Sequence, residues 1–228
     1  MDAEPFTLEV KDQTPAVVTA PSYGTMDLRR SDCMDMMAEF PDGYFDLAIV
    51  DPPYGIGVNS MNLGSRKSAR PSDKKWDNKI PKPDYFLELF RVSKTQIIWG
   101  GNYMIENLKS SPCWLIWDKM QEFSGAAFEM AWTSFNSPAK AFRMSRVEAY
   151  ANQDKFHPTQ KPVALYQWLL ANYAKPGQRI LDTHLGSGSH AIACYYAGMH
   201  LTACEIDEDY FKAASERIER ETAQTVLF

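Results

Sequence analysis

Four consecutive residues, Asp51-Pro52-Pro53-Tyr54, combine a carboxylate, two rigid backbone units and an aromatic ring. Proline fixes φ at about −65° and disfavours helical geometry in the residue before it, so Asp51 and Pro52 are both held extended. The Asp51 carboxylate and the Pro52 carbonyl can then each accept one hydrogen of a planar amino group, while Tyr54 stacks on the base. Acceptors aimed in this way stabilise the nitrogen as it gives up its lone pair. The tetrad therefore predicts a site that presents an aromatic amino group as a nucleophile; the alternative is a proline-rich turn in which Asp51 caps a helix.

A second stretch with chemical meaning lies near the other end of the chain. Gly186, Gly188 and Ala191 have the G-x-G-x-x-(G/A) spacing of a nucleotide-binding turn. Glu205 follows about twenty residues later, where an acid meets ribose hydroxyls. An ordinary strand-to-helix turn would also explain the glycines alone. With Glu205 at this distance, the pattern predicts an adenosine-containing cofactor without specifying which one.

Strands must position both stretches. The largely apolar run 45–50 before the tetrad is typical of a buried strand in a parallel sheet, and residues 179–182 form a short strand before the glycine turn. Open α/β sheets bind ligands outside the carboxyl ends of their strands. Each of the two stretches is therefore expected at such a strand end.

The remaining pattern completes an α/β arrangement. The strands at 112–117 and 128–135 are expected to form an antiparallel pair at the sheet edge, and their tryptophans are expected in the core. A helix after the glycine turn should end near Gly198, which suits a position just past a helix. Further strands are expected at 26–31, 95–99 and 200–207, and further helices at 35–40, 84–92, 163–173 and 209–220.

Taken together, these residues resemble the β class of DNA methyltransferases that methylate amino groups and use S-adenosylmethionine. The resemblance covers roughly residues 26–220. Its motifs are the tetrad, His157-Pro158-Thr159-Gln160-Lys161-Pro162, the stretch 181–188 and Glu205-Ile206-Asp207, in that order. This order is that of a circularly permuted methyltransferase chain. Because permutation leaves the sheet intact, the resemblance implies that the tetrad and the glycine turn face each other across a shared crevice. The segments 99–103, 114–119 and 129–133 are similar to those of small bacterial and phage adenine methyltransferases.

The resemblance implies a class I methyltransferase fold, which is Rossmann-like: a doubly wound, mostly parallel, seven-stranded sheet with an antiparallel edge hairpin. It also implies that Glu205 holds the ribose of the cofactor and that Asp32 lies near its adenine. His157 and Lys161 are expected to close over its methionine part. The full set of expected cofactor-binding residues is Asp32, Cys33, Asp51, His157, Lys161, Asp182, His184, Gly186, Ser187, Gly188, Glu205 and Ile206.

The implied reaction is direct in-line transfer of a methyl group to the N6 of a flipped-out adenine. Adenine is preferred to cytosine N4 because enzymes of the latter kind more often begin the tetrad with serine. The alternatives are a cytosine-N4 enzyme, an RNA or protein-glutamine methyltransferase, and an inactive nucleotide-binding module. The chain departs from the family pattern at Thr183 and His184, where proline and phenylalanine are usual, which puts cofactor affinity and its pH response in question.

The formal net charge of −5 is unusual for a protein that grips DNA, so the distribution of charge matters. Basic residues gather before residue 84 and again after residue 139, whereas 205–221 is mostly acidic. A solvated surface loop would also explain the first group. We expect phosphate contacts with double-stranded DNA from Arg66, Lys67, Arg70, Lys74, Lys75, Lys140, Arg143 and Arg146.

Composition predicts one domain at 23–228 after a loosely held tail at 1–22, with a basic loop at about 58–83 and a target-recognition region at about 121–156. The four cysteines include no C-x-x-C pair, which favours reduced thiols in the cytoplasm and no metal site. No apolar stretch is long enough for a membrane span. The sequence leaves open a homodimer, a cognate restriction enzyme and the recognised DNA sequence.

Overall fold

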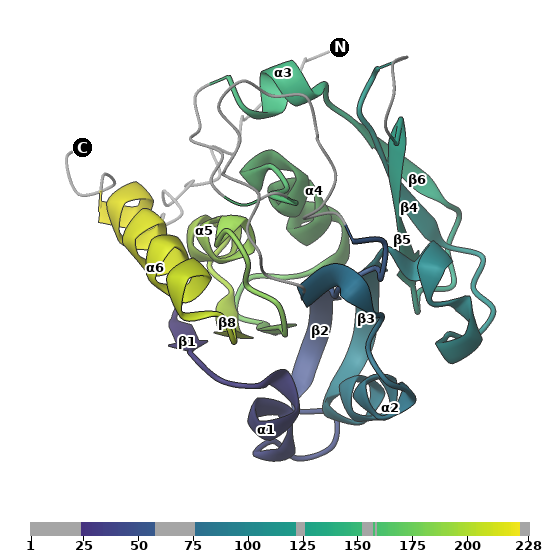
Figure 1. Cartoon of the computed structure of the whole chain (residues 1–228), viewed down its shortest axis with the longest axis horizontal. Helices are drawn as coiled ribbons and strands as arrows, with labels where there is room; N and C mark the ends of the chain where they lie inside the picture. Colours follow the sequence, from purple (N-terminus) through teal and green to yellow (C-terminus); the bar gives the residue numbers. More distant parts are fainter. Residues whose placement is uncertain (1–23, 58–75, 122–125, 152–156, 158, 224–228) are drawn as a thin grey trace, which may run out of the picture.

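The computed structural model describes residues 24–57, 76–121, 126–151, 157 and 159–223 (Figure 1). The predicted tail at 1–22 lies outside these ranges, as do five of the proposed DNA contacts: Arg66, Lys67, Arg70, Lys74 and Lys75.

The architecture is one mixed sheet of eight strands in the order β1-β8-β7-β2-β3-β5-β4-β6. The strands from β1 to β3 in this order are parallel, β5 runs antiparallel to both β3 and β4, and β6 is parallel to β4. The strands are β1 (Met26–Arg29), β2 (Phe45–Val50), β3 (Ser93–Trp99), β4 (Trp114–Asp118), β5 (Phe128–Thr133), β6 (Lys140–Arg143), β7 (Arg179–Asp182) and β8 (His200–Cys204).

Helices cover both faces of the sheet (Figure 1). Leu47 and Ile49 of β2 pack with the helices near the C-terminus, whereas Ala48 and Val50 pack with the first two helices. This alternation follows from the two-residue period of a strand, and it makes β2 apolar on both sides. The helices are α1 (Cys33–Ala38), α2 (Pro83–Val92), α3 (Arg146–Ala149), α4 (Val163–Tyr173), α5 (Ser189–Tyr196) and α6 (Glu208–Ala223), with 3₁₀ turns at Trp76–Asn78, Gly101–Tyr103 and Ile105–Asn107.

The fold class is confirmed, with two corrections. The sheet has eight strands in the described residues rather than seven, because β6 adds to β4. For the same reason the antiparallel pair β4–β5 lies inside the sheet and β6 forms its edge. This strand, Lys-Ala-Phe-Arg, has no apolar run; its Phe142 ring packs on Trp168 with ring centroids 5.7 Å apart. Charged ends of this kind are typical of edge strands, which must avoid pairing with other chains.

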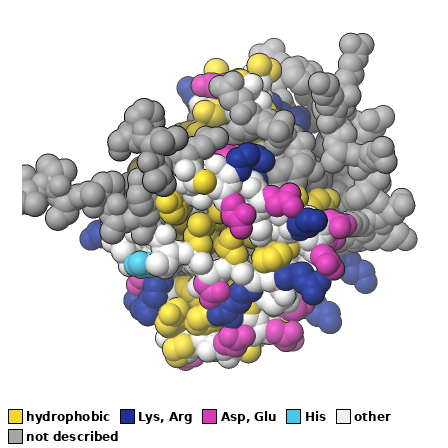
Figure 2. All heavy atoms as spheres, turned by 90° about the vertical axis from the view of Figure 1, so that its left-hand side faces the viewer, with side chains coloured by type: hydrophobic (Ala, Val, Ile, Leu, Met, Phe, Trp, Pro, Cys, Tyr) yellow, Lys and Arg dark blue, Asp and Glu magenta, His cyan; other side chains and the backbone are white. Residues whose placement is uncertain are grey.

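Charges of both signs are interspersed on the side of the molecule where α6 and β1 lie (Figure 2). The acidic character of 205–221 is partly neutralised there, since Arg30 pairs with Glu208 and Arg217 pairs with Glu221. This face therefore carries charges of both signs. Among the described residues, no helix has both the length and the apolar character that a bilayer span requires.

Candidate active site

A cavity of about 460 Å³ lies where the tetrad after β2 meets the turn after β7. The first half of the chain contributes Asp51 and Pro53, and the rest of the wall comes from residues after 156. The expected crevice between the two ends of the chain is thus present. Its lining residues are Asp51, Pro53, His157, Thr159, Gln160, Lys161, Tyr166, His184, Leu185, Gly186, Ser187, Ser189, Glu205, Ile206, Asp207 and Tyr210.

The backbone of the tetrad is held by Asp77, a buried residue that no sequence motif singled out. Its Oδ1 accepts hydrogen bonds from the backbone N–H groups of Tyr54, at 2.7 Å, and Gly55, at 3.1 Å. Gly57 donates to the Asp77 carbonyl at 2.9 Å. The turn after Pro53 is therefore fixed from outside the tetrad.

The Tyr54 side chain turns back toward its own tetrad. Its hydroxyl donates to Asp51 Oδ1 at 2.6 Å, and its ring stacks on Tyr103 with centroids 5.4 Å apart. The ring also covers Gly100, where an added Cβ would lie 2.1 Å from a Tyr54 ring carbon. Burial and the nearby Asp51 raise the pKa of Tyr54 well above 10, so the hydroxyl stays protonated and remains a donor.

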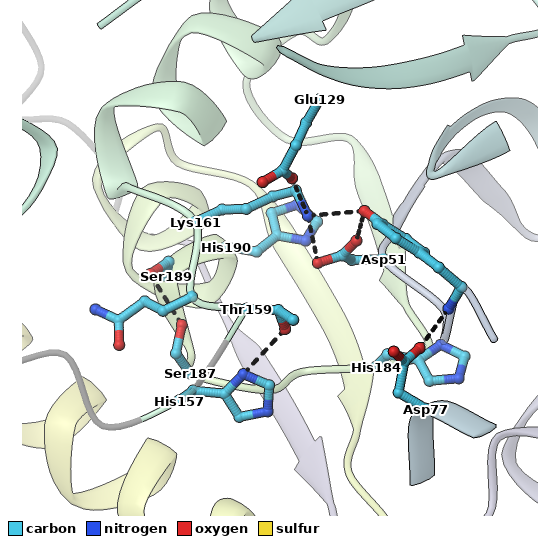
Figure 3. Close-up of polar contacts among 12 residues, drawn as sticks. Asp51, Asp77, Glu129, His157, Thr159, Lys161, His184, Ser187, Ser189 and His190 are labelled. Carbon is cyan, nitrogen blue, oxygen red and sulfur yellow. Dashed lines mark hydrogen bonds and ion pairs between the residues drawn. The ribbon is translucent and has the colours of Figure 1, made fainter. Parts of the chain in front are cut away.

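Lys161 lies within hydrogen-bonding distance of three oxygens (Figure 3). Its Nζ is 2.5 Å from Asp51 Oδ2, 3.1 Å from the Tyr54 hydroxyl and 3.0 Å from Glu129 Oε2. The Lys161 side chain is 1% exposed, so its charge must be balanced by these partners. Glu129, on β5, is a second site residue that the sequence motifs missed.

Burial raises the pKa of each of the two carboxylates, Asp51 and Glu129, and the charge of Lys161 lowers it. For Asp51, burial outweighs the attraction of Lys161 and raises the pKa. For Glu129, burial is outweighed by Lys161 and Lys119 together, and the pKa falls to about 2. Glu129 is therefore fully ionised at neutral pH, whereas Asp51 is the more easily protonated of the two.

The glycine turn is built as its spacing predicts. Gly186 and Gly188 have φ of +54° and +76°, and α5 begins directly after Gly188. Glu205 accepts a hydrogen bond from the Gly186 N–H at 3.0 Å and another from Asp207, which fixes both its oxygens at the cavity wall. Gly188 does not line the cavity; a Cβ there would lie 2.9 Å from Ile218 of α6. Gly188 instead lets α6 pack closely on the turn.

Asp182 is another expected cofactor residue that lies behind the wall rather than in it. It accepts hydrogen bonds from the His184 N–H at 3.0 Å and pairs with His190 Nδ1 at 2.9 Å. The His190 ring stacks on Tyr166, with centroids 4.7 Å apart. Asp182 thus shapes the turn through two neighbours.

Of the other expected cofactor residues, some line the cavity and some do not. His157 lies at the wall with its ring edge against Tyr210, at 4.4 Å between centroids, and Ile206 lines the cavity while its side chain remains exposed. Asp32 caps α1, its Oδ1 accepting from the Met34 N–H at 2.7 Å, and neither Asp32 nor Cys33 lines the cavity. Burial raises the pKa of Cys33 to about 12, so its thiol is protonated at neutral pH.

The three proposed DNA contacts within the described residues lie on β6 and α3. Lys140 and Arg143 are exposed at the two ends of β6, and Arg146 begins α3. Arg143 Nε is 3.5 Å from Asp118, and Lys140 donates to Asn172 at 3.0 Å. Lys140 and Arg143 are thus accessible at the sheet edge, and Arg146 is partly exposed on α3.

His184, the departure from the family pattern, is neutral at physiological pH because burial lowers its pKa to about 4. Its ring lies edge-on to Tyr85 at 5.7 Å, and its Nδ1 is 2.9 Å from the Thr183 hydroxyl. A histidine whose pKa is lowered by folding costs no stability above its unfolded pKa of about 6.5, because it is neutral in both states. As pH falls from about 6.5 toward 4, the unfolded state binds the proton more readily and the free energy of unfolding decreases.

We therefore expect His184→Phe to flatten the acid side of the stability curve. Between pH 7 and pH 4, the free energy of unfolding of the parent should fall by up to about 3 kcal/mol more than that of the variant. The reason is that the parent must either bury a charged imidazolium or release its proton in order to fold. Chemical denaturation at several pH values measures this difference, with the exposed His200→Gln as the control. Parallel curves for parent and His184→Phe would show that this imidazole titrates normally.

The strand order and the position of the cavity define a class I methyltransferase fold. Residues 106–216 match the family model described as DNA methylase. The "Putative methylase YubD" of Escherichia coli (strain K12) is 25% identical over 206 residues, covering 83% of this chain and 88% of that protein. Type II methyltransferase M2.DpnII of Streptococcus pneumoniae is 27% identical over 147 residues, covering 64% of this chain and 50% of that protein. The chain is thus similar to DNA methylases of the N6/N4 family, and the matched model covers residues 106–216.

Solved structures show the same fold. The M1.HpyAVI-SAM complex superposes with a TM-score of 0.55 at 15% identity, covering 85% of this chain and 99% of that one. The PvuII DNA methyltransferase, which is cytosine-N4-specific, superposes with a TM-score of 0.59 at 13% identity, covering 89% of this chain and 93% of that one. Both chains match nearly over their full length, so the fold likeness includes the sheet and the helices on its two faces.

Proposed function

We propose that this chain is a site-specific DNA methyltransferase that transfers a methyl group from S-adenosylmethionine to the exocyclic N6 of an adenine swung out of duplex DNA. One observation carries the proposal: Asp51 and Pro53 of the tetrad line the same cavity as Gly186, Ser187 and Glu205. An acceptor for an amino group and a nucleotide-binding turn thus share one space. The DNA methylase family match and the tetrad's acidic first residue support this choice.

The cavity suits a cationic nucleoside. Its volume of about 460 Å³ is within the range of small-ligand sites, about 300–1,000 Å³. Asp51, Glu205 and Asp207 line it, whereas Lys161 is ion-paired and His184 is neutral. When bound, S-adenosylmethionine supplies an electrophilic methyl group on a positively charged sulfonium. We propose that Glu205 holds the ribose and that Gly186, Ser187 and His157 surround the methionine part.

The reactive nitrogen belongs to the target base, and the chain has to hold it. In the proposed arrangement, Asp51 Oδ1 and the Pro52 carbonyl each accept one hydrogen of the base amino group. The Tyr54 hydroxyl now occupies Asp51 Oδ1, so it must leave as the base enters. Its ring is then free to stack on the base. The amino nitrogen bonds to the methyl carbon in line as the methyl–sulfur bond breaks and its electron pair stays on sulfur, which leaves a neutral thioether. The nitrogen then loses one proton along its hydrogen bond to Asp51, and no covalent enzyme intermediate is formed.

Double-stranded DNA is the proposed partner. Lys140, Arg143 and Arg146 place positive charge at the β6 edge, in the region where we expect target recognition. Such side chains position a duplex through its phosphates, while base edges give specificity.

Labelled S-adenosylmethionine tests the proposal when duplex DNA, RNA and protein are offered in parallel. We expect label in duplex DNA, and digestion to nucleosides should yield N6-methyladenine. N4-methylcytosine would overturn the adenine assignment and leave the site assignment standing. Label in RNA or protein alone would overturn the proposed substrate. Sequencing of DNA modified by the expressed protein would then give the recognised sequence.

A further inference from the structure

We propose that Glu129 is a positioning residue of the methyl-transfer site, which holds the Lys161 ammonium against Asp51 so that one oxygen of Asp51 is fixed and the other is presented to the base. The inference rests on the proposed function for its catalytic meaning. The contacts that carry it link β5, through Lys161, to the tetrad after β2 (Figure 3).

The chain of contacts alternates in charge. Glu129 Oε1 is 2.6 Å from Lys119 Nζ, and Glu129 Oε2 is 3.0 Å from Lys161 Nζ. Lys161 in turn is 2.5 Å from Asp51 Oδ2. Two ammonium groups and two carboxylates therefore alternate from the β4–β5 hairpin to the tetrad. The sum of their formal charges is zero, which is the condition for burying them together.

The Lys161 ammonium depends on protein oxygens for its hydrogen bonds because its side chain is buried. Its ammonium has three N–H groups, and three oxygens lie within 3.1 Å of it. Around it are the rings of Trp99 and Tyr54, whose centroids are 5.2 Å and 5.6 Å from Nζ. Without Glu129, one of the three donors would lose its charged acceptor inside an aromatic wall, and the ammonium would no longer be pulled from two sides.

The two oxygens of Asp51 are held differently as a result. Oδ2 is in a charge-assisted contact with Lys161, whereas Oδ1 accepts from the neutral Tyr54 hydroxyl. Both contacts are charge-assisted when Asp51 is ionised, but only the contact with Lys161 joins two opposite charges, so Oδ1 is the oxygen whose partner can be exchanged. A base amino group then replaces Tyr54 at Oδ1 while Lys161 keeps the carboxylate from rotating. Glu129 contacts Asp51 only by way of Lys161, and its charge also raises the pKa of Asp51 directly; it does not touch the base, in contrast to the tetrad residues of the proposed arrangement.

The charges of Glu129 and Lys161 shift the pKa of Asp51 in opposite directions, and these shifts can be measured. Burial raises the pKa of Asp51, Lys161 lowers it and Glu129 raises it. Glu129→Gln should therefore lower the pKa of Asp51. Lys161→Met should raise it by about one unit or more, because an opposite charge within 4–6 Å is lost. Since Asp51 must be ionised to accept the amino hydrogen, the acid limb of the kcat profile should move to lower pH in Glu129→Gln and to higher pH in Lys161→Met.

The experiment uses the full chain and two readouts. The first is the carboxyl ¹³C titration of Asp51, assigned by loss of its signal in Asp51→Asn and measured without substrate. The second is the pH profile of kcat for methyl transfer to duplex DNA. Glu106→Gln, an exposed carboxylate on the 3₁₀ turn Ile105–Asn107, is the matched control and should leave both readouts unchanged. If Lys161→Met does not fold, the direction of the Asp51 pKa shift is decided by Glu129→Gln alone. The double variant Lys161→Met/Glu129→Gln then serves as a second test, because it removes one charge of each sign.

The expected result is an Asp51 pKa that falls in Glu129→Gln, with the acid limb of kcat moving in the same direction and the affinity for S-adenosylmethionine unchanged within about twofold. An Asp51 pKa equal to that of the parent in Glu129→Gln would overturn the inference. A lower kcat with an unmoved acid limb would also overturn it, since a purely structural role gives that pattern. If the titration shifts as expected but the parent methylates no DNA, the proposed function fails while the coupling of Glu129 to Asp51 stands.

Discussion

Asp51→Ala should lower methyl transfer to duplex DNA by about a thousandfold or more, while binding of S-adenosylmethionine stays measurable. The carboxylate is the charged member of the proposed acceptor pair, and loss of one pre-aimed transition-state contact alone costs about 10²–10³ in kcat. Its other partners explain why the loss should exceed this range: Lys161 and Tyr54 both bond to Asp51 and would lose their common anchor. Label transfer measures the rate, and calorimetric titration measures cofactor binding.

Two further variants separate chemistry from folding. Asp51→Asn keeps the shape of the side chain and should also be strongly impaired, because the amide carries no charge to stabilise the amino group. Asp84→Ala, an exposed acid at the start of α2, should behave like the parent. Turnover of Asp51→Ala within about tenfold of the parent would remove the proposed role of the tetrad.

Gly100→Ala should reduce kcat by about a hundredfold with little change in cofactor affinity. Gly100 has φ +68°, and its added Cβ would lie 2.1 Å from the Tyr54 ring. The ring therefore has to move, and a misplacement of about 1 Å at a reacting group costs on the order of 10²-fold. Gly100 is not among the residues that line the cavity, so the cofactor should bind as before.

Gly177→Ala is the matched control for Gly100→Ala. Its φ is +82°, yet nothing lies within 4 Å of the added Cβ. Both variants therefore carry the strain of a left-handed alanine, and Gly100→Ala alone adds a clash with Tyr54. Equal activities in the two variants would mean that the position of Tyr54 does not limit the reaction.

Sequence patterns predicted the parts of the fold that have strong local signals. Phe45–Val50 is apolar on both faces because helices cover both, and the glycine turn after β7 needs two residues with positive φ. The cavity between them was implied by the permuted motif order of the resemblance, together with the meeting of strand carboxyl ends at one edge of a parallel sheet. These signals were sufficient to place Asp51 opposite Gly186.

Contacts between distant segments could not be predicted in this way. Glu129 and Lys161 are 3.0 Å apart through their side chains, but no motif spacing connects β5 with the segment before α4. Asp77 likewise reaches the tetrad from 23 residues away, by hydrogen bonds to backbone. Such partners depend on the three-dimensional path of the chain and not on any periodic pattern.

The structure also gives partners that the resemblance did not include. Lys161 lines the cavity, and its ammonium is bonded to Asp51, Glu129 and Tyr54. Asp182 is buried against His190. A buried ion must be paired within the protein, and sequence alone does not show which groups become buried.

A crystal structure of the chain with S-adenosylmethionine is the most direct test of the central claim, that the tetrad and the glycine turn serve one reaction. We expect the ribose at Glu205 and the sulfonium methyl group directed toward Asp51, within the cavity lined by Gly186 and Ser187. Cofactor bound elsewhere, or bound here with its methyl group directed away from Asp51, would contradict the account.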